Sequence, residues 1–505
     1  MTKGTDVSGP SFYWYDFETF GLGRRTDRPA QFAGIRTDMD LNPISKGDII
    51  YARPSEDYLP SPESCLITGL TPQLCAEKGI AESEFAGEIW ARFNTPETVS
   101  IGYNTLGFDD EVSRFLFWRN FLEPYAHQWK GGCSRWDIFP LVCAVWSLRG
   151  NDFAWPRWSE MDPEAFPQAE NREGVCFKLE ALSKANGIVH EHAHDAFSDV
   201  EATIGLARLI AEKEPRLWQW AFDNRSKAKV KAAVEKGPVV WVSPKFGQKS
   251  GFLRIAASIA PNTANPNEVF MWDLMHDPEE LSALGAAEMR ERLFARRDAL
   301  PEGVSPLPVY RLSLNNAPFV CGSLKVLPEN RAAAYGIDMT AVLQNFQKLD
   351  RVRAQLQAAL SDYTEDRIHK PASDVDFGLY DAGFPSKHDT LLMQDIRRMS
   401  PEKLTSSANE GKLIFDDARF NELLFRFRAR NWPDTLTEEE QARWRAFCHE
   451  RLIESDGSQN GVLNISEYFD EIDRLQETAW DDEEKQAVLE ALYEWGEQVG
   501  EACSA

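Results

Sequence analysis

A run of aromatic residues that contains two carboxylates constrains the fold more than any other feature of this chain. The run, residues 11–19, reads Ser-Phe-Tyr-Trp-Tyr-Asp-Phe-Glu-Thr. Successive side chains of a β-strand point to opposite faces, so we expect Asp16 and Glu18 on one face and Tyr15 and Phe17 on the other. Two adjacent carboxylates repel each other unless they share a cation, and oxygen ligands suit Mg²⁺ or Mn²⁺. The run therefore predicts a strand that carries a divalent-metal site.

Two further acidic motifs follow downstream in an order typical of nucleases. Residues 102–109 read Gly-Tyr-Asn-Thr-Leu-Gly-Phe-Asp, and residues 194–199 read His-Asp-Ala-Phe-Ser-Asp. Two metals about 4 Å apart can activate a water, neutralise phosphate charge and stabilise the leaving oxygen. The carboxylates expected to hold them are Asp16, Glu18, Asp109 and Asp199. His194 stands where a polar turn gives way to a helix, so we expect it to act as the general base.

Length and charge limit the classes of protein to which the chain can belong. Single cores stop growing at about 250–300 residues, so 505 residues predict two or three domains. The net charge of −25 is concentrated in residues 431–505, which hold 20 acidic and 5 basic side chains. This negative charge argues against a protein that coats DNA non-specifically. Contact with nucleic acid would need a local groove of basic and aromatic side chains.

The sequence predicts a cytoplasmic protein with reduced thiols. No run of about 18 apolar residues is present, and residues 1–8 are polar and do not form a signal segment. The eight cysteines include no C-x-x-C pair, which argues against a zinc ribbon, and we expect most of them to be buried.

Periodicity divides the chain into three regions, which we expect to span residues 12–213, 214–368 and 369–505. The first region alternates strands at 12–19, 31–37 and 98–104 with helices at 109–120, 177–185 and 195–211, and it holds a proline-bearing surface insertion at 155–174. The second has strand-like runs at 238–243, 253–257 and 269–273, and a helix at 341–360. The third starts with an Asp-, Gly- and Pro-rich linker at 369–387 and continues as helices. The expected fold class is multidomain α/β plus α+β.

The ordered motifs resemble the histidine-bearing branch of the DEDD exonuclease superfamily, because a histidine stands five residues before the last aspartate. Within that branch the chain is similar to the bacterial exodeoxyribonuclease I family, in residues 15–21, 27–38, 66–73, 108–112, 184–188 and 428–433. The resemblance implies a ribonuclease H-like exonuclease domain, an SH3-like β domain and a helical C-terminal domain, together C-shaped. It also implies that single-stranded DNA is degraded from its 3′ end to 5′-mononucleotides, in DNA repair and recombination.

The resemblance implies roles for individual residues as well. Two Mg²⁺ ions, which Mn²⁺ can replace, would be held by Asp16, Glu18 and Asp199, assisted by Asp109, with His194 as the base. The implied substrate contacts are Glu18, Lys178, Thr19, Arg114, Tyr125 and Trp129. Aromatic side chains can stack unpaired bases of any sequence, and arginine pairs with phosphate. Lys178 and Cys143 stand where the family has arginine, so one phosphate contact becomes a point charge and another is in doubt.

A protein partner is implied too. It is the bacterial single-stranded DNA-binding protein, whose acidic tail would bind at a basic pocket that includes Arg149. We expect the enzyme itself to be a monomer.

Simpler interpretations accompany these. His190, His192 and His194 cluster, but no other ligand has zinc spacing with them, so we expect His190 and His192 to be surface loop residues. Without the resemblance, Tyr125 and Trp129 would be expected to pack in a core.

Two alternative functions remain open. An RNA-trimming or proofreading exonuclease would share the catalytic motifs but would leave the regions after residue 213 unexplained. A catalytically silent DNA-binding scaffold would have no reason to keep four mutually repelling carboxylates.

Overall fold

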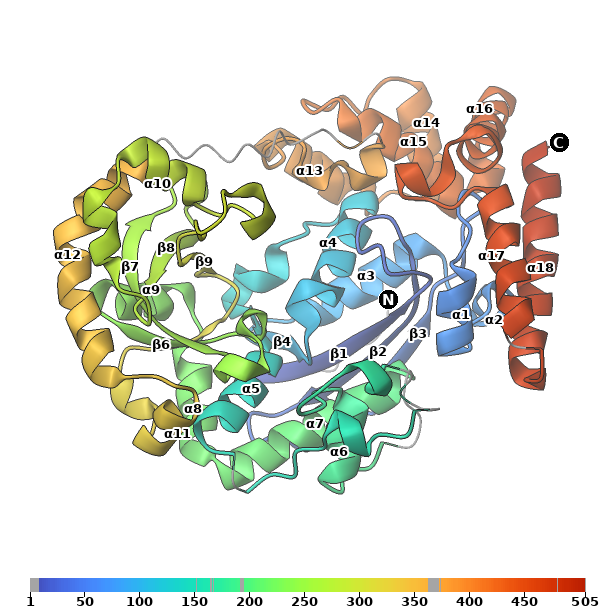
Figure 1. Ribbon diagram of the computed structural model, residues 1–505. Helices are drawn as coiled ribbons and strands as arrows, with labels where there is room; N and C mark the ends of the chain where they lie inside the picture. Colours follow the sequence, from blue (N-terminus) through green and yellow to red (C-terminus); the bar gives the residue numbers. More distant parts are fainter. Residues whose placement is uncertain are drawn as a thin grey trace. The chain divides into compact units, whose positions relative to one another are not determined.

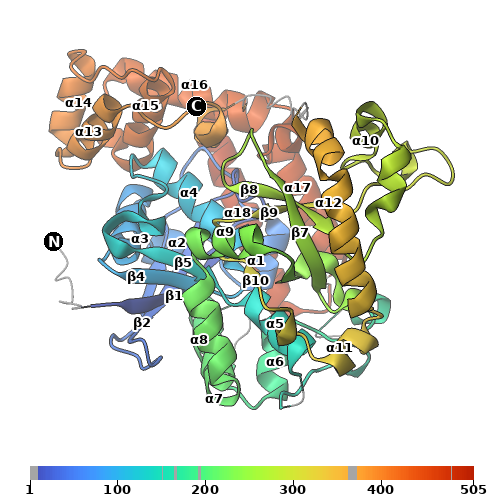
Figure 2. The ribbon, with the colours of Figure 1, turned by 90° about the vertical axis from the view of Figure 1, so that its left-hand side faces the viewer.

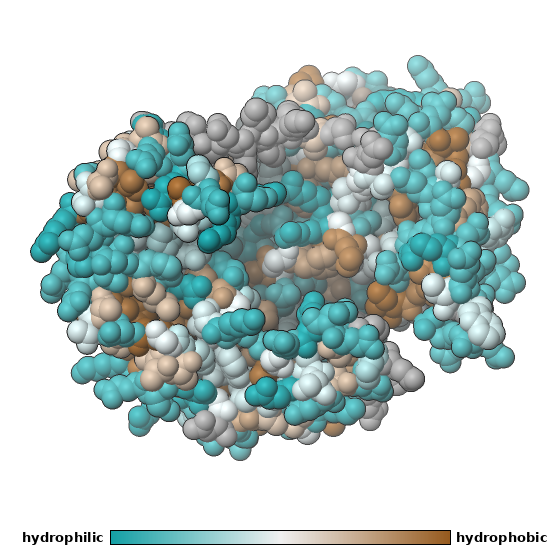
Figure 3. Space-filling model, viewed as in Figure 1, coloured by the Kyte–Doolittle hydropathy of each residue, from teal (hydrophilic) through white to brown (hydrophobic). Residues whose placement is uncertain are grey.

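The computed structural model describes residues 9–150, 152–163, 166, 168–190, 195–361, 372, 374–478 and 480–504. They divide into two compact units. The first contains the described residues of Met1–Arg135, Val189–Ile204 and His369–Ala505, and the second those of Trp136–Ile188 and Gly205–Ile368. Among the described residues, no helix is long and apolar enough to cross a lipid bilayer. Hydrophilic side chains cover most of the face drawn in Figure 3, and hydrophobic ones form separate small patches.

The first unit is built on a mixed sheet with the strand order β3-β2-β1-β4-β5 (Figure 1). Its strands are β1 Ser11–Thr19, β2 Pro29–Thr37, β3 Asp48–Tyr51, β4 Thr98–Gly102 and, at the boundary between the units, β5 Ser134–Asp137. β1 pairs antiparallel with β2 and parallel with β4. A parallel pair needs a long crossover, which here contains the helices α1 Pro62–Thr68, α2 Pro72–Lys78 and α3 Glu82–Phe93. The strands predicted at 12–19, 31–37 and 98–104 are confirmed.

Helices α3 and α4 Asp109–Arg119 cover one face of this sheet (Figures 1 and 2). Three aromatic side chains of one face of β1 form a buried cluster with helices α3 and α4. They are Tyr13, Tyr15 and Phe17, and they pack with Phe85, Ile89 and Phe93 of α3 and Leu116 of α4. Helix α7 Ala196–Lys213 begins in the first unit and ends in the second. The helices predicted at 109–120 and 195–211 are confirmed.

The C-terminal part of the first unit is helical, as the sequence predicts. Its helices are α13 Lys387–Ile396, α14 Pro401–Asn409, α15 Arg419–Asn431, α16 Glu438–His449, α17 Ile465–Thr478 and α18 Glu483–Ser504. α17 and α18 form a hairpin, in which the Tyr468 hydroxyl donates to the Leu492 carbonyl oxygen at 2.8 Å. A Cβ at Gly496 would lie 2.7 Å from the Tyr468 ring, so this close approach requires glycine.

The second unit contains an antiparallel sheet with the order β10-β6-β7-β8-β9. Its strands are β6 Val239–Val242, β7 Leu253–Pro261, β8 Glu268–Asp273, β9 Val309–Ser313 and β10 Phe319–Cys321. Its helices are α5 Phe139–Leu148, α6 Leu179–Ala185, α8 Pro215–Asn224, α9 Lys227–Lys236, α10 Ala286–Arg292, α11 Glu329–Ala334 and α12 Met339–Ser361. Arg353 and Gln357 of α12 donate to carbonyl oxygens of β7. The strands and the helix predicted for this region are confirmed.

Two expectations about loops are wrong. Residues 155–174 are not merely a surface insertion, because Trp158 and Phe166 pack with Cys176 and Ala181 in a small core. Residues 374–380 of the expected linker form a 3₁₀ helix, Val375–Tyr380, that is largely buried. All eight cysteines are buried and unbridged, as expected.

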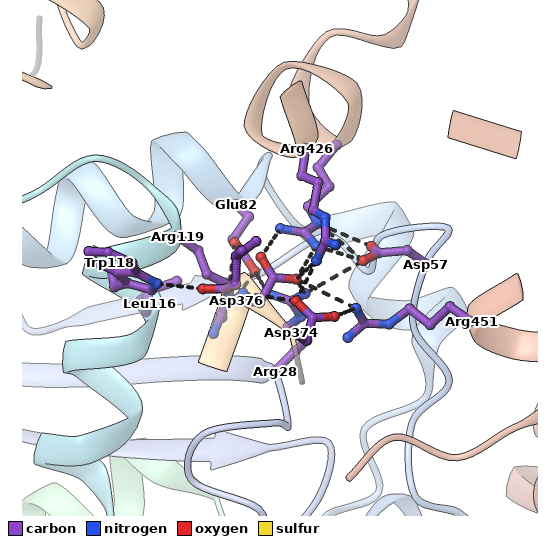
Figure 4. Close-up of polar contacts among 12 residues, drawn as sticks. Arg28, Asp57, Glu82, Leu116, Trp118, Arg119, Asp374, Asp376, Arg426 and Arg451 are labelled. Atoms are coloured by element: carbon purple, nitrogen blue, oxygen red, sulfur yellow. Dashed lines mark hydrogen bonds and ion pairs between the residues drawn. The ribbon is translucent and has the colours of Figure 1, made fainter. Parts of the chain in front are cut away.

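The buried 3₁₀ helix belongs to an ion network that joins the N-terminal and C-terminal parts of the first unit (Figure 4). The Asp376 side chain is fully buried and forms ion pairs with Arg28, Arg426, Arg430 and Arg451. The other members of the network are Asp57, Glu82, Arg119 and Asp374. Glu82 begins α3, Arg28 precedes β2, and Arg426 and Arg430 lie on α15.

Arginine neighbours keep these carboxyls ionised. Burial by itself raises the pKa of Asp57, but Arg430 and Arg28 outweigh it and hold that pKa well below its ordinary value. The same opposition, of burial against Arg119 and Arg28, lowers the pKa of Glu82 to about 2. Removing one partner of such a buried ion pair strongly destabilises the fold, because it leaves the other charge buried and unpaired.

Removing Arg430 tests the network. Arg430→Ala leaves Asp57 and Asp376 buried without their shortest ion pairs, and we expect the free energy of unfolding to fall by about 3–5 kcal/mol. Urea titration followed by tryptophan fluorescence measures the change. The matched control is Arg443→Ala, whose half-exposed side chain pairs with Glu422 at the surface and is expected to cost about 1 kcal/mol or less. Equal losses in the two variants would contradict the structural role of the network.

Candidate functional site: a carboxylate cluster

Strand β1 presents Asp16 and Glu18 from the middle of the sheet. The opposite face of the strand carries Tyr15 and Phe17, and the Tyr15 ring lies 4.6 Å from that of Phe93. These buried aromatic side chains fix which face of the strand carries the acids, because a slip of one residue would reverse the two faces. The register of pairing between β1 and β2 shifts directly after Glu18, so regular strand pairing ends next to this carboxylate.

The other two carboxylates stand at the starts of helices. Asp109 is the first residue of α4, and Asp199 lies in the first turn of α7. The Asp195 side chain accepts a hydrogen bond from the Ser198 amide at 3.3 Å and so caps α7. The partial positive charge of a helix N-terminus favours a carboxylate at both positions. Asp109 also accepts a hydrogen bond from the Phe17 amide at 3.3 Å, which ties it to β1.

Three of these side chains converge closely enough to share a metal ion. One carboxylate oxygen each from Asp16, Glu18 and Asp199 lies within 4.8 Å of the others. Oxygens bound to a single Mg²⁺ at about 2.1 Å can be no more than about 4.2 Å apart, so small side-chain rotations would complete the coordination. The structure thus brings together the three residues that the sequence nominates as metal ligands, with Asp109 beside them.

The negative charge of the clustered carboxylates favours the binding of a cation. Burial raises the pKa of Asp16 well above its ordinary value, and the charges of Asp109, Glu18 and Asp199 raise it further. Burial, followed by the charges of Asp199 and Asp109, raises the pKa of Glu18 to about 9. A divalent cation would favour the ionised forms and reverse both shifts, so the donor set fits such an ion.

The histidines of the turn before α7 differ from expectation in one respect. His194 and His192 lie outside the described residues. His190 is not a surface side chain, because its ring is 3% exposed and its Nε2 lies 2.5 Å from Asp199 Oδ1. The sequence carries no sign of this contact with the first turn of α7, because histidine is common in exposed loops.

Among the expected DNA-contacting residues of the first unit, the structure places Tyr125 beside Arg114. Its guanidinium lies 5.3 Å from the Tyr125 ring and forms ion pairs with Asp110 and Glu111. Trp129 is 64% exposed, so it is not the core residue that its type alone would suggest. Tyr125 also packs edge-on against the exposed ring of Phe384, 5.5 Å away, a contact that the sequence did not indicate. The Thr19 hydroxyl donates to the Gly21 carbonyl oxygen at 2.7 Å.

The remaining predicted residues lie in the second unit. Lys178 precedes α6, and its Nζ lies 5.2 Å from the Phe166 ring. Cys143 is completely buried on α5, so its side chain offers no surface for DNA. Arg149 follows α5, is one-third exposed and pairs with Glu214 at 3.6 Å.

Comparison with known proteins identifies the family. The family model described as Exonuclease matches residues 13–207, Exonuclease I SH3-like domain matches 225–364, and Exonuclease I C-terminal domain matches 373–499. The exodeoxyribonuclease I of Haemophilus influenzae is 40% identical over 491 residues, which cover 96% of this chain and 98% of that protein. The chain belongs to the exodeoxyribonuclease I family.

Other members of the family agree along almost the whole length. The exodeoxyribonuclease I of Escherichia coli K12 is 37% identical over 503 residues, covering 99% of this chain and 100% of that protein. The crystal structure of E. coli exonuclease I with a dA16 oligonucleotide superposes with a TM-score of 0.85 at 35% identity and covers 97% of this chain and 100% of that one. The chain is therefore an exonuclease that combines a ribonuclease H-like domain, an SH3-like domain and a C-terminal domain.

Because burial and neighbouring carboxylates disfavour the charged form of Glu18, we expect the metal-free protein to become more stable when Glu18 is replaced by a neutral residue. A folded-state pKa near 9, above the ordinary 4.5, means that wild-type stability falls as the pH rises between these values. Glu18→Gln removes this loss, so in EDTA it should raise the free energy of unfolding by about 1–3 kcal/mol at pH 7.

Thermal unfolding in EDTA at pH 5 to 8 measures the effect, and the gain should grow with pH. Glu84→Gln, at an exposed position of α3, is the control and should change little. A Gln variant no more stable than wild type at pH 8 would show that Glu18 is not under this repulsion.

Proposed function

We propose that this protein degrades single-stranded DNA from its 3′ end to 5′-mononucleotides and that it acts in DNA repair and recombination. The observation that carries the proposal is the convergence of Asp16, Glu18 and Asp199 beside Asp109. It occurs in a chain that matches the exonuclease family from the first domain to the last. The E. coli relative has been crystallised with dA16, which supports DNA as the substrate.

A divalent metal belongs to the chemistry of this exonuclease domain, and a zinc-bound form of an E. coli exonuclease I complex with single-stranded DNA is known. We propose that the physiological metal is Mg²⁺, that two ions bind and that Mn²⁺ can substitute. Asp16, Glu18 and Asp199 would hold the ions, assisted by Asp109. When bound, they would supply charge neutralisation at the phosphate and activation of a water.

Side chains of this protein would accept the proton of the water and hold the DNA. His194, five residues before Asp199, would accept the proton of the attacking water, since a neutral imidazole can do so near pH 7. Lys178 would contact a phosphate as a point charge. Tyr125 and Trp129 would stack bases, and Trp129 has the exposure this needs. Thr19 and Arg114 would line the path of the DNA strand. Arg114 also forms ion pairs with Asp110 and Glu111, which partly neutralise its charge.

The proposed domain limits are 12–213, 214–368 and 369–505. We further propose that the protein is a cytoplasmic monomer. An RNA-trimming or proofreading exonuclease is less well supported, because the match extends through the SH3-like and C-terminal domains. A silent scaffold is less well supported, because it would have no use for a costly cluster of carboxylates that a bound cation would relieve.

The first test is nucleotide release from a 5′-labelled single-stranded DNA oligomer. We expect Mg²⁺-dependent shortening from the 3′ end, none in EDTA, and a rate for Asp16→Asn that is lower by about a hundredfold or more. Asp40→Asn, on an exposed turn, is the control and should keep the wild-type rate. An RNA oligomer of the same sequence should be cut more slowly. DNA binding without release in Mg²⁺ would favour the scaffold, and faster cleavage of RNA would favour the trimming enzyme.

The proposed protein partner is the single-stranded DNA-binding protein. A crystal structure of SSB/Exonuclease I in complex with the inhibitor CFAM supports this association for a relative. In this chain Arg149 would receive the acidic tail. Its backbone carbonyl accepts a hydrogen bond from Arg331 at 3.0 Å, and its guanidinium contacts Glu214 at 3.6 Å and donates to the Val326 carbonyl oxygen at 3.3 Å.

Substitution of Arg149 tests that contact. A fluorescein-labelled peptide of the partner's acidic tail should bind Arg149→Ala at least about tenfold more weakly than wild type, because a charged hydrogen bond contributes about 1.5–3 kcal/mol. Arg216→Ala, on an exposed position of α8, is the matched control. If both variants bind the peptide with wild-type affinity in a fluorescence titration, Arg149 has no role in this contact.

A further inference from the structure

The α17–α18 hairpin carries a groove that the nuclease reaction does not use. It has a volume of about 660 Å³ and is lined by Gln476 of α17, Trp480, and Glu483, Gln486, Ala487, Glu490, Tyr493 and Glu494 of α18. Large aromatic side chains lie open in it, since Trp480 is 76% exposed and Tyr493 is 41% exposed. Exposed tryptophan and tyrosine side chains beside a hollow are typical of protein-binding surfaces.

The groove lies on the face of α18 that does not pack inward. Leu489, Leu492 and Val499 turn the other face into the core, where they meet Tyr468 and Ile472 of α17. The lining residues of α18 recur at steps of three and four, which places them in one stripe along the helix. The apolar core of the hairpin therefore does not use this stripe. Gln486 ties the stripe to the Gln476 carbonyl oxygen of α17 at 3.4 Å, while Glu483, Glu490 and Glu494 are exposed.

Carboxylates give the groove its charge. Glu483, Glu490 and Glu494 contribute three of its lining side chains. Within the described part of the chain, no salt bridge engages any of these three, whereas the neighbouring Lys485 is paired with Asp482 at 2.9 Å. The acidic surroundings of residues 431–505 add to the same field. DNA and acidic peptides are repelled here, and a cationic ligand is attracted.

We propose that this groove binds a cationic amphipathic helix of a partner protein. The lining stripe from Glu483 to Glu494 is about 16 Å long at 1.5 Å per residue, so it matches about three turns of a third helix laid against the hairpin. Lysine or arginine on one side of that helix would pair with the three carboxylates. Aliphatic side chains on the other would cover Trp480 and Tyr493. The site is separate from the proposed nuclease chemistry, so the surface would attach the enzyme to a basic protein while it handles DNA elsewhere.

A designed peptide tests the proposal. The probe is a fluorescein-labelled 14-residue amphipathic helix of lysine and leucine, and the matched probe has glutamate in place of lysine. Fluorescence anisotropy with the full chain should show binding of the lysine peptide that weakens with added salt, and no binding of the glutamate peptide. Trp480→Ala and Glu490→Lys should each weaken lysine-peptide binding at least about fivefold.

Controls separate the groove from general acidity and from misfolding. Glu439→Lys makes the same charge change at an exposed position of α16 and should leave the affinity unchanged. All variants should keep the wild-type melting temperature and nuclease rate. The proposal is overturned if Glu439→Lys weakens binding as much as Glu490→Lys, or if Trp480→Ala binds like wild type. It is also overturned if Trp480→Ala lowers the sedimentation mass of the protein alone, which would assign the groove to a second copy of the chain.

Discussion

The buried ion network around Asp376 is the interaction on which the first unit depends. Arg28 enters it directly before β2, the strand that pairs with the metal-site strand β1 along most of its length. Glu82 enters it at the start of α3, whose side chains pack against the aromatic face of β1. Arg426 and Arg430 bring α15 to the same point. The C-terminal helices thus brace the elements that hold Asp16 and Glu18 in place.

The network and the carboxylate cluster of Asp16, Glu18 and Asp199 bury the same acidic groups in opposite electrostatic surroundings. In the network, carboxyls such as Asp57 and Glu82 are buried beside arginines, and their pKa values fall. In the site, Asp16 and Glu18 are buried beside other carboxylates, and their pKa values rise. The first arrangement contains its own counter-charges and is structural. The second leaves its charge to be balanced by a ligand, which is typical of a functional site.

Local sequence was informative where periodicity and motif spacing set the structure. The alternation of residues 11–19 predicted both the strand β1 and the face that carries Asp16 and Glu18, and helical spacing predicted α4, α7 and α12. Prediction failed where burial depends on partners distant in the chain. The Asp- and Gly-rich composition of residues 374–380 is typical of exposed linkers, but here its carboxylates are buried beside arginines from distant parts of the chain, Arg28, Arg426, Arg430 and Arg451. His190 is similar, since its side chain is buried beside Asp199, nine residues later in the chain.

The span of the network along the chain has a consequence for biosynthesis. Asp57 binds Arg430, 373 residues later, and Arg28 binds Asp376, 348 residues later. A nascent chain that has released only its exonuclease segment from the ribosome would lack Asp376, the third partner of Arg28, and Arg430, the nearest partner of Asp57. The network of this unit can therefore close only after the 3₁₀ helix Val375–Tyr380 and α15 have been made. Completion of the network is thus a late event in synthesis, because its last members are made more than 300 residues after its first.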